Sequence, residues 1–168
     1  MSEETSYDED FHAWTIDQAD RLRRASKVQA EEMLGVDFDH IIEEVEDLGR
    51  SERRQVTSNL AMALEHMIKI AAVPKSELVP DWRKEVVTGI RNARRAFTPS
   101  MRQRMDAQDL WSEAREDALQ TLIEDDVSSG DIPITAPLTL EDLTDPGMTA
   151  VDLIAIVVRA MPGDRFEV

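Results

Sequence analysis

The chain has 168 residues, no cysteine and a formal net charge of −16 at pH 7, and hydrophobic residues make up 42% of it. This length and composition suffice for one globular domain with its own core. Without cysteine the chain has no disulfide, no thiolate zinc site and no cysteine nucleophile, and its negative charge disfavours nucleic acid and anionic membranes as partners unless the basic residues gather in one place.

The first part of the chain predicts two helices after an acidic start. Its first ten residues, MSEETSYDED, are polar and acidic, the opposite of a signal peptide, so we expect a cytoplasmic protein. Ser6 or Asp8 is expected to cap the first helix. Ser26, with Gln29 three residues later, has the spacing of a capping box and predicts a short second helix that ends at Gly35.

A long central segment comes next. From Asp39 onward, apolar residues recur at the 3.6-residue spacing of a helix for about thirty residues. Gly49 and Ser51 leave two alternatives open: one long helix kinked near Gly49, or two helices with Ser51 as the N-cap of the second. Pro74 and Pro80 are expected to bracket the loop that follows.

The second half of the chain predicts further helices separated by proline-containing loops. Asp81 is expected to cap the next helix, and Thr98-Pro99 is typical of an N-cap followed by proline at the first helical position. The helical run that starts there is expected to reach about Asp126, either without a break or with a restart at Asp106. A loop over 128–137 follows, and Thr139–Asp142 opens one further helical turn.

The end of the chain is unusually apolar. Residues 148–161 leave helix and strand open by composition, although Thr149 as an N-cap favours a helix. The longest apolar run, Leu153–Val158, is too short to span a bilayer, so we expect no membrane contact. We therefore predict an all-α bundle of about five to seven helices, with a single helical domain over 1–147 and an apolar appendage over 148–168 that packs on this domain, on a partner or on a second copy.

Basic residues gather in one segment. Arg83–Arg104 contains seven bases and one acid, so its net charge is +6. It could form a phosphate-binding surface, with Trp82 or Phe97 stacking on bases. The alternative, which we favour, is pairing with residues 37–47, which hold six acids and no lysine or arginine. The candidate residues of this basic stripe are Arg83, Arg91, Arg94 and Arg95.

Signatures of an enzyme or a metal site are missing from the sequence. Di-metal helical bundles use a Glu-x-x-His pair, but Met62-Ala63 stands where His66 would need that glutamate, and no Glu-x-x-His or His-x-x-x-His occurs in the chain. Neither a glycine-rich phosphate loop nor a G-x-S-x-G elbow is present. We predict no metal and no cofactor, and we assign no catalytic residue.

Several motifs follow one another in a characteristic order. They are Tyr7–Phe11, Trp14, Ala19, Leu22-Arg23, Asp37, Ile42–Glu52, Leu64, His66, Met67, Lys69, Trp82-Arg83, Arg91, Pro99-Ser100 and Pro137–Leu140. In this order of features the chain resembles the bacterial "domain of unknown function 29" family over about residues 7–147. Family members often have an aromatic residue soon after the His-x-x-Lys motif, where this chain has Ile70-Ala71-Ala72, and the tail after Met148 lies outside the family pattern. The resemblance implies an all-helical fold and carries no activity.

The family pattern also indicates which polar residues to consider together. We hypothesise one interior or cleft-edge network, which would fix helix register if it is structural and would lie in a concave pocket if it is functional. Its candidate members are Glu43, Glu44, Glu46, Arg53, His66 and Arg91.

The sequence favours a non-enzymatic protein-interaction or scaffold module, with self-association through the apolar tail as one form of partnership. The second candidate is a small metal- or His/carboxylate-dependent enzyme centred on Glu43, Glu46 and His66. The third is a nucleic-acid partner that binds through the basic stripe.

Overall fold

A computed structural model describes residues 7–28, 36–125 and 127–162. These residues form six α-helices and three short 3-10 helices, and none of them forms a β-strand, which confirms the predicted all-α class. No helix in these ranges is both long and apolar enough to cross a membrane. The elements in chain order are α1 (Phe11–Val28), α2 (Phe38–Ala72), α3 (Val79–Ala96), η1 (Pro99–Arg104), α4 (Ala107–Thr121), η2 (Ile123–Asp125), η3 (Ser129–Asp131), α5 (Leu140–Thr144) and α6 (Ala150–Ala160).

The internal contacts of the chain divide it into two compact units. Unit 1 consists of Met1–Gln55 and Phe97–Arg104, and unit 2 consists of Val56–Ala96 and Met105–Val168. Helix α2 therefore contributes its first half to unit 1 and its second half to unit 2. The apolar α6 belongs to unit 2, and the division of the chain into a domain over 1–147 and an appendage over 148–168 stays a prediction.

In unit 1, α1 begins at Phe11 and is capped by Asp10, not by the predicted Asp8, while the alternative cap Ser6 lies outside the described residues. The Asp10 carboxylate accepts a hydrogen bond from the backbone N–H of Ala13 at 2.9 Å, which is the bond of a helix N-cap. The predicted helix start at Ser26 is also wrong, because α1 continues to Val28 and the Ser26 hydroxyl donates to the Arg23 carbonyl within it. The rest of that predicted helix, residues 29–35, lies outside the described residues.

Helix α2 passes through Gly49 without interruption, so the alternative of two helices is wrong. The reason for a glycine at this position is the neighbouring helix. A Cβ added to Gly49 would overlap the hydroxyl of Thr15 and lie 3.3 Å from Nδ1 of His12, and both of these α1 residues are buried. Gly49 is therefore a contact residue of the α1–α2 pair, and its small size allows the two backbones to come close.

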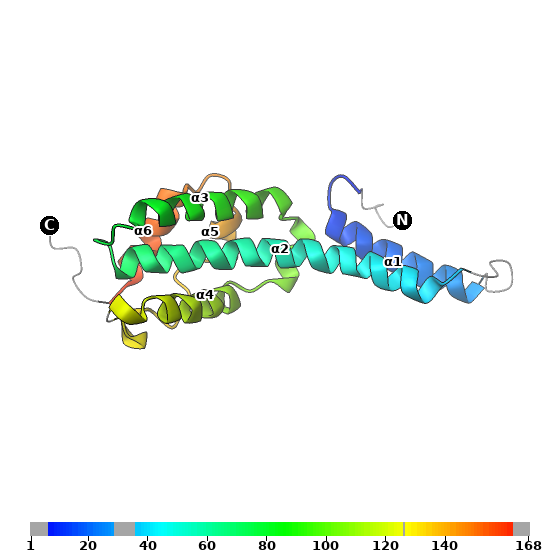
Figure 1. Cartoon of the computed structure of the whole chain (residues 1–168). Helices are drawn as coiled ribbons and strands as arrows, with labels where there is room; N and C mark the ends of the chain where they lie inside the picture. Colours follow the sequence, from blue (N-terminus) through cyan, green and yellow to red (C-terminus); the bar gives the residue numbers. More distant parts are fainter. Residues whose placement is uncertain (1–6, 29–35, 126, 163–168) are drawn as a thin grey trace. The chain divides into compact units, whose positions relative to one another are not determined.

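Unit 2 is built around the second half of α2, with α3 and α4 on opposite sides of it (Figure 1). Gly89 of α3 faces α2 so closely that a Cβ there would lie 2.7 Å from the Asn59 carbonyl oxygen. On the other side, the Thr121 hydroxyl of α4 donates to Glu65 at 3.4 Å. Helix α3 begins at Val79, two residues before the predicted cap Asp81, because proline is tolerated in a first helical turn.

The remaining helix starts of unit 2 agree with local sequence signals. Asp106 caps α4 by accepting from the Gln108 N–H, and the Thr139 hydroxyl caps α5. Thr149 and Asp152 form a capping box at the start of α6, so the residues that composition left open are a helix. Helix α4 ends at Thr121, earlier than predicted, and is followed by the short η2. The inward face of α6 consists of the buried residues Leu153, Ile154 and Val157.

Candidate functional site

Arg94 of α3 holds α5 and the segment that follows it in place. Its Nε donates to the Leu143 carbonyl at 3.0 Å, one Nη donates to the Met148 carbonyl at 2.8 Å, and the other lies 3.5 Å from the Asp142 carbonyl. Burial lowers the pKa of the Arg94 guanidinium, and the Asp145 carboxylate partly offsets this change. An arginine remains charged under such conditions, so its rigid fork of donors serves here as a clamp on backbone oxygens.

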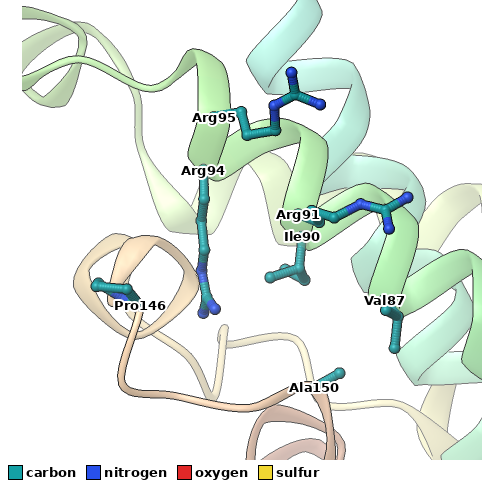
Figure 2. A pocket seen from close by; sticks show the side chains of 7 residues that line it. All are labelled: Val87, Ile90, Arg91, Arg94, Arg95, Pro146 and Ala150. Atoms are coloured by element: carbon teal, nitrogen blue, oxygen red, sulfur yellow. The ribbon is translucent and has the colours of Figure 1, made fainter.

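A cavity of about 430 Å³ lies next to this clamp, and we call it the α3–α6 groove. Its size is within the range of small-ligand sites. The floor is apolar, since Ile90 is buried and Val87 is about half-exposed. The lining residues are Val87, Ile90, Arg91, Arg94, Arg95, Pro146 and Ala150 (Figure 2).

The three arginines of the groove have different environments. Figure 2 shows the Arg94 side chain extending toward the segment that carries Pro146, whereas the side chains of Arg91 and Arg95 extend away from it. Arg91 and Arg95 are exposed and, among the described residues, neither has an ion pair. They lie four residues apart, so they share one face of α3. The groove thus combines an apolar floor with two available cations, which suits an anionic group attached to an apolar one.

The fourth predicted residue of the basic stripe, Arg83, lies outside the groove. Arg83 is exposed but does not line the groove. Its neighbour Lys84 is paired with Asp81 at 2.7 Å, and the hydrogen bond from this pair raises the pKa of Lys84. Arg94 donates to backbone carbonyls and is a structural clamp. The other three predicted residues, Arg83, Arg91 and Arg95, are exposed cations. A common binding role for all four stays a prediction.

The acidic segment of α2 makes its ion pairs within unit 1. Glu46 pairs with Arg23 and, at 3.6 Å, with Arg50, and Arg50 also pairs with Asp47. The hydrogen bond to Glu46 raises the pKa of Arg23. At the helix start, the Asp37 carboxylate and the His40 ring pair locally, and this bond raises the pKa of His40. The expected pairing of this segment with the basic stripe stays a prediction.

The six residues of the hypothesised polar network are divided between the two units. Glu43, Glu44, Glu46 and Arg53 belong to unit 1, while His66 and Arg91 belong to unit 2. Within unit 2, His66 Nδ1 lies 2.8 Å from the Met62 carbonyl oxygen, one turn back along its own helix, and Arg91 lines the groove without His66. The single network therefore stays a prediction.

Two polar features were missed by sequence reasoning. Lys69 is 7% exposed and forms an ion pair with Glu65 at 2.5 Å, a pair whose i,i+4 spacing is visible in the sequence although its burial is not. His12 is 3% exposed, with Nδ1 lying 3.0 Å from the Gly49 carbonyl oxygen, and its buried Nε2 has no hydrogen-bond partner in the described part of the chain. Within the described ranges, no cluster of three histidine, aspartate or glutamate residues could hold a metal ion.

The fold and the groove define an acidic all-α protein whose final helices are clamped to α3 by an arginine. Residues 6–148 match the family described as "Domain of unknown function DUF29", so the chain belongs to this family and the predicted resemblance is confirmed. Helix α6 begins just beyond the match. A crystal structure of an alpha-helical protein of unknown function from Rhodospirillum rubrum is similar, with 32% identity, coverage of 95% of this chain and 100% of that chain, and a TM-score of 0.85. No curated protein matches the chain.

Proposed function

We propose that this chain is a non-enzymatic protein-interaction module of the bacterial cytoplasm, and that its α3–α6 groove takes an acidic, partly apolar segment of a protein partner. One observation carries this proposal: Arg91 and Arg95 are exposed cations beside an apolar floor, and no described carboxylate pairs with them. Grooves of this kind bind amphipathic helices through apolar anchors, while charges at the edge give selectivity and faster association.

The enzyme hypothesis receives less support from the surroundings of its residues. Glu46 is engaged by two arginines, and His66 faces a backbone carbonyl of its own helix. These partners suit structural roles. Calorimetry with a divalent cation, on chelator-stripped wild type and His66→Ala, tests the hypothesis directly. Stoichiometric binding that is lost in the variant would make a metal-dependent enzyme the leading idea, whereas a lower melting temperature without binding supports a structural histidine.

The nucleic-acid hypothesis needs several arginines that act together on phosphates. Arg94 is occupied by three carbonyl oxygens, which leaves Arg83, Arg91 and Arg95 exposed on a chain of net charge −16. This arrangement favours a local acidic partner over a long polyanion. Binding of a labelled single-stranded oligonucleotide tests the nucleic-acid hypothesis. If the arginines act together on phosphates, the oligonucleotide should bind, and its affinity should fall steeply as salt is added.

The proposal is tested by the binding of a labelled helical peptide that carries leucines at positions i, i+3 and i+7 among glutamates, followed by fluorescence anisotropy. We expect the variant Arg91→Glu/Arg95→Glu to weaken binding by more than about tenfold. The matched control, Arg83→Glu/Arg102→Glu, changes the net charge equally at exposed positions outside the groove and is expected to bind like wild type. No binding to wild type, or equal losses in both variants, would contradict the proposal.

A further inference from the structure

The first turns of α2 present exposed apolar side chains among carboxylates. Ile41 is 41% exposed and Leu48 is 52% exposed, although both lie on a helix with a buried opposite side. With Glu44 between them they occupy positions i, i+3 and i+7, which follow one face of a helix. Glu43 is exposed as well, but at i+2 from Ile41 it lies on a neighbouring side of the helix and not on this face. We call Ile41, Glu44 and Leu48, together with the neighbouring Glu43, the acidic face.

The carboxylates of the acidic face differ from their neighbours in forming no ion pair with the described residues, although Glu43 interacts electrostatically with His40. Glu46 and Asp47, on the same turns, are held by Arg23 and Arg50. Glu43 and Glu44 are exposed, and neither forms an ion pair with the described residues. A helix that docks in a groove uses exposed apolar side chains as anchors, and its carboxylates can pair with cations of the groove. The acidic face carries both kinds of side chain.

The α3–α6 groove offers the complementary features. Arg91 and Arg95 stand one helical turn apart beside the apolar floor formed by Val87 and Ile90. Ala150, the first residue of α6, adds a further apolar side chain to the lining. The groove therefore provides cations for two carboxylates and apolar surface for two aliphatic side chains.

We infer that the occupant of the groove is the acidic face of a second copy of this chain, an inference that rests on the function proposed above. Each copy carries both surfaces, so the groove of one copy can take the acidic face of another. The net charge of −16 opposes unspecific contact between copies. Salt screens this long-range repulsion beyond about 8 Å at physiological ionic strength and weakens close pairs much less.

The test is the mass of the full-length protein by light scattering after gel filtration, over a range of concentrations. We expect wild type and the control Arg83→Glu/Arg102→Glu to self-associate. Arg91→Glu/Arg95→Glu and Glu43→Arg/Glu44→Arg are each expected to remain monomeric with unchanged helical circular dichroism. An equimolar mixture of these two variants is expected to regain an associated species, because the exchanged charges are again opposite.

The outcomes separate this inference from the proposed function. A monomeric wild type that still binds the labelled acidic peptide through Arg91 and Arg95 overturns the inference and leaves the interaction module standing. A wild type that neither self-associates nor binds the peptide overturns both. Self-association that survives Arg91→Glu/Arg95→Glu, or a mixture that stays monomeric, also overturns the inference.

Discussion

Replacing Gly49 with alanine tests the close approach of α1 and α2 in unit 1. At an exposed helical position this change stabilises a protein by up to about 1 kcal/mol, because alanine has the higher helix propensity. Here the new Cβ would overlap the Thr15 hydroxyl and lie 3.3 Å from His12 Nδ1. Overpacking of a buried contact costs about 1–3 kcal/mol. Displacing His12 from the Gly49 carbonyl costs about 1 kcal/mol more, because the histidine is buried.

We therefore expect Gly49→Ala to lower the free energy of unfolding by about 1–3 kcal/mol after the gain in helix propensity is subtracted. Urea denaturation followed by circular dichroism measures this change. The matched test repeats Gly49→Ala in a Thr15→Ala background, where the overlapping hydroxyl is gone and the substitution should cost less. A stabilised Gly49→Ala protein, or the same cost in both backgrounds, would show that the two helices are not limited by this contact.

Three further predictions concern other contacts. Hydrogen bonds from Ala13 and Ser100 outweigh burial and lower the pKa of Asp10 below its ordinary value of 3.8. A lowered pKa stabilises the folded state above the unfolded pKa, so the stability difference between wild type and Asp10→Asn should be full at neutral pH and shrink as the pH falls through about 4 in acid titrations of unfolding. Arg94→Lys keeps the charge but loses the fork, and should lower the free energy of unfolding by about 1.5–3 kcal/mol in urea; an unchanged value would refute the clamp. Leu153→Ala should lower the free energy of unfolding by about 2–5 kcal/mol if α6 packs within unit 2. Val151→Ala, at an exposed position, should lower it by less than about 1 kcal/mol, and thermal melting measures both changes.

The sequence was most informative where structure depends on residues a few positions apart. Thr149 and Asp152 predict the start of α6 because a capping box needs only four consecutive residues. Asp106 likewise caps α4. Both signals hold regardless of what packs against the helix, so the all-α class and several helix starts follow from them.

The sequence was least informative where a distant contact decides between equivalent residues. Asp8 and Asp10 are equally good caps by composition, but Asp10 accepts a hydrogen bond at 2.7 Å from the hydroxyl of Ser100, ninety residues away. The sequence pattern makes Gly49 resemble a helix break, whereas the structure shows that this glycine lies against Thr15 and His12. No local pattern contains such information.

The same limit applied to the candidate site. The sequence singled out Arg91, Arg94 and Arg95 as one stripe, because their charge is visible and their surroundings are not. Only the carbonyls of Leu143 and Met148 distinguish the clamping arginine from the two exposed ones. The groove itself depends on Pro146 and Ala150, which carry no recognisable chemistry.

The Arg94 clamp also sets the order in which the groove can be completed during synthesis. Its acceptors are 48, 49 and 54 residues further along the chain. At about 5–20 residues per second, the ribosome needs on the order of 3–10 s to add that length. During this interval the apolar floor of α3 has no wall formed by Pro146 and Ala150. A polypeptide released before Met148 would therefore lack the groove. Partner binding by the proposed route requires that translation has passed this residue.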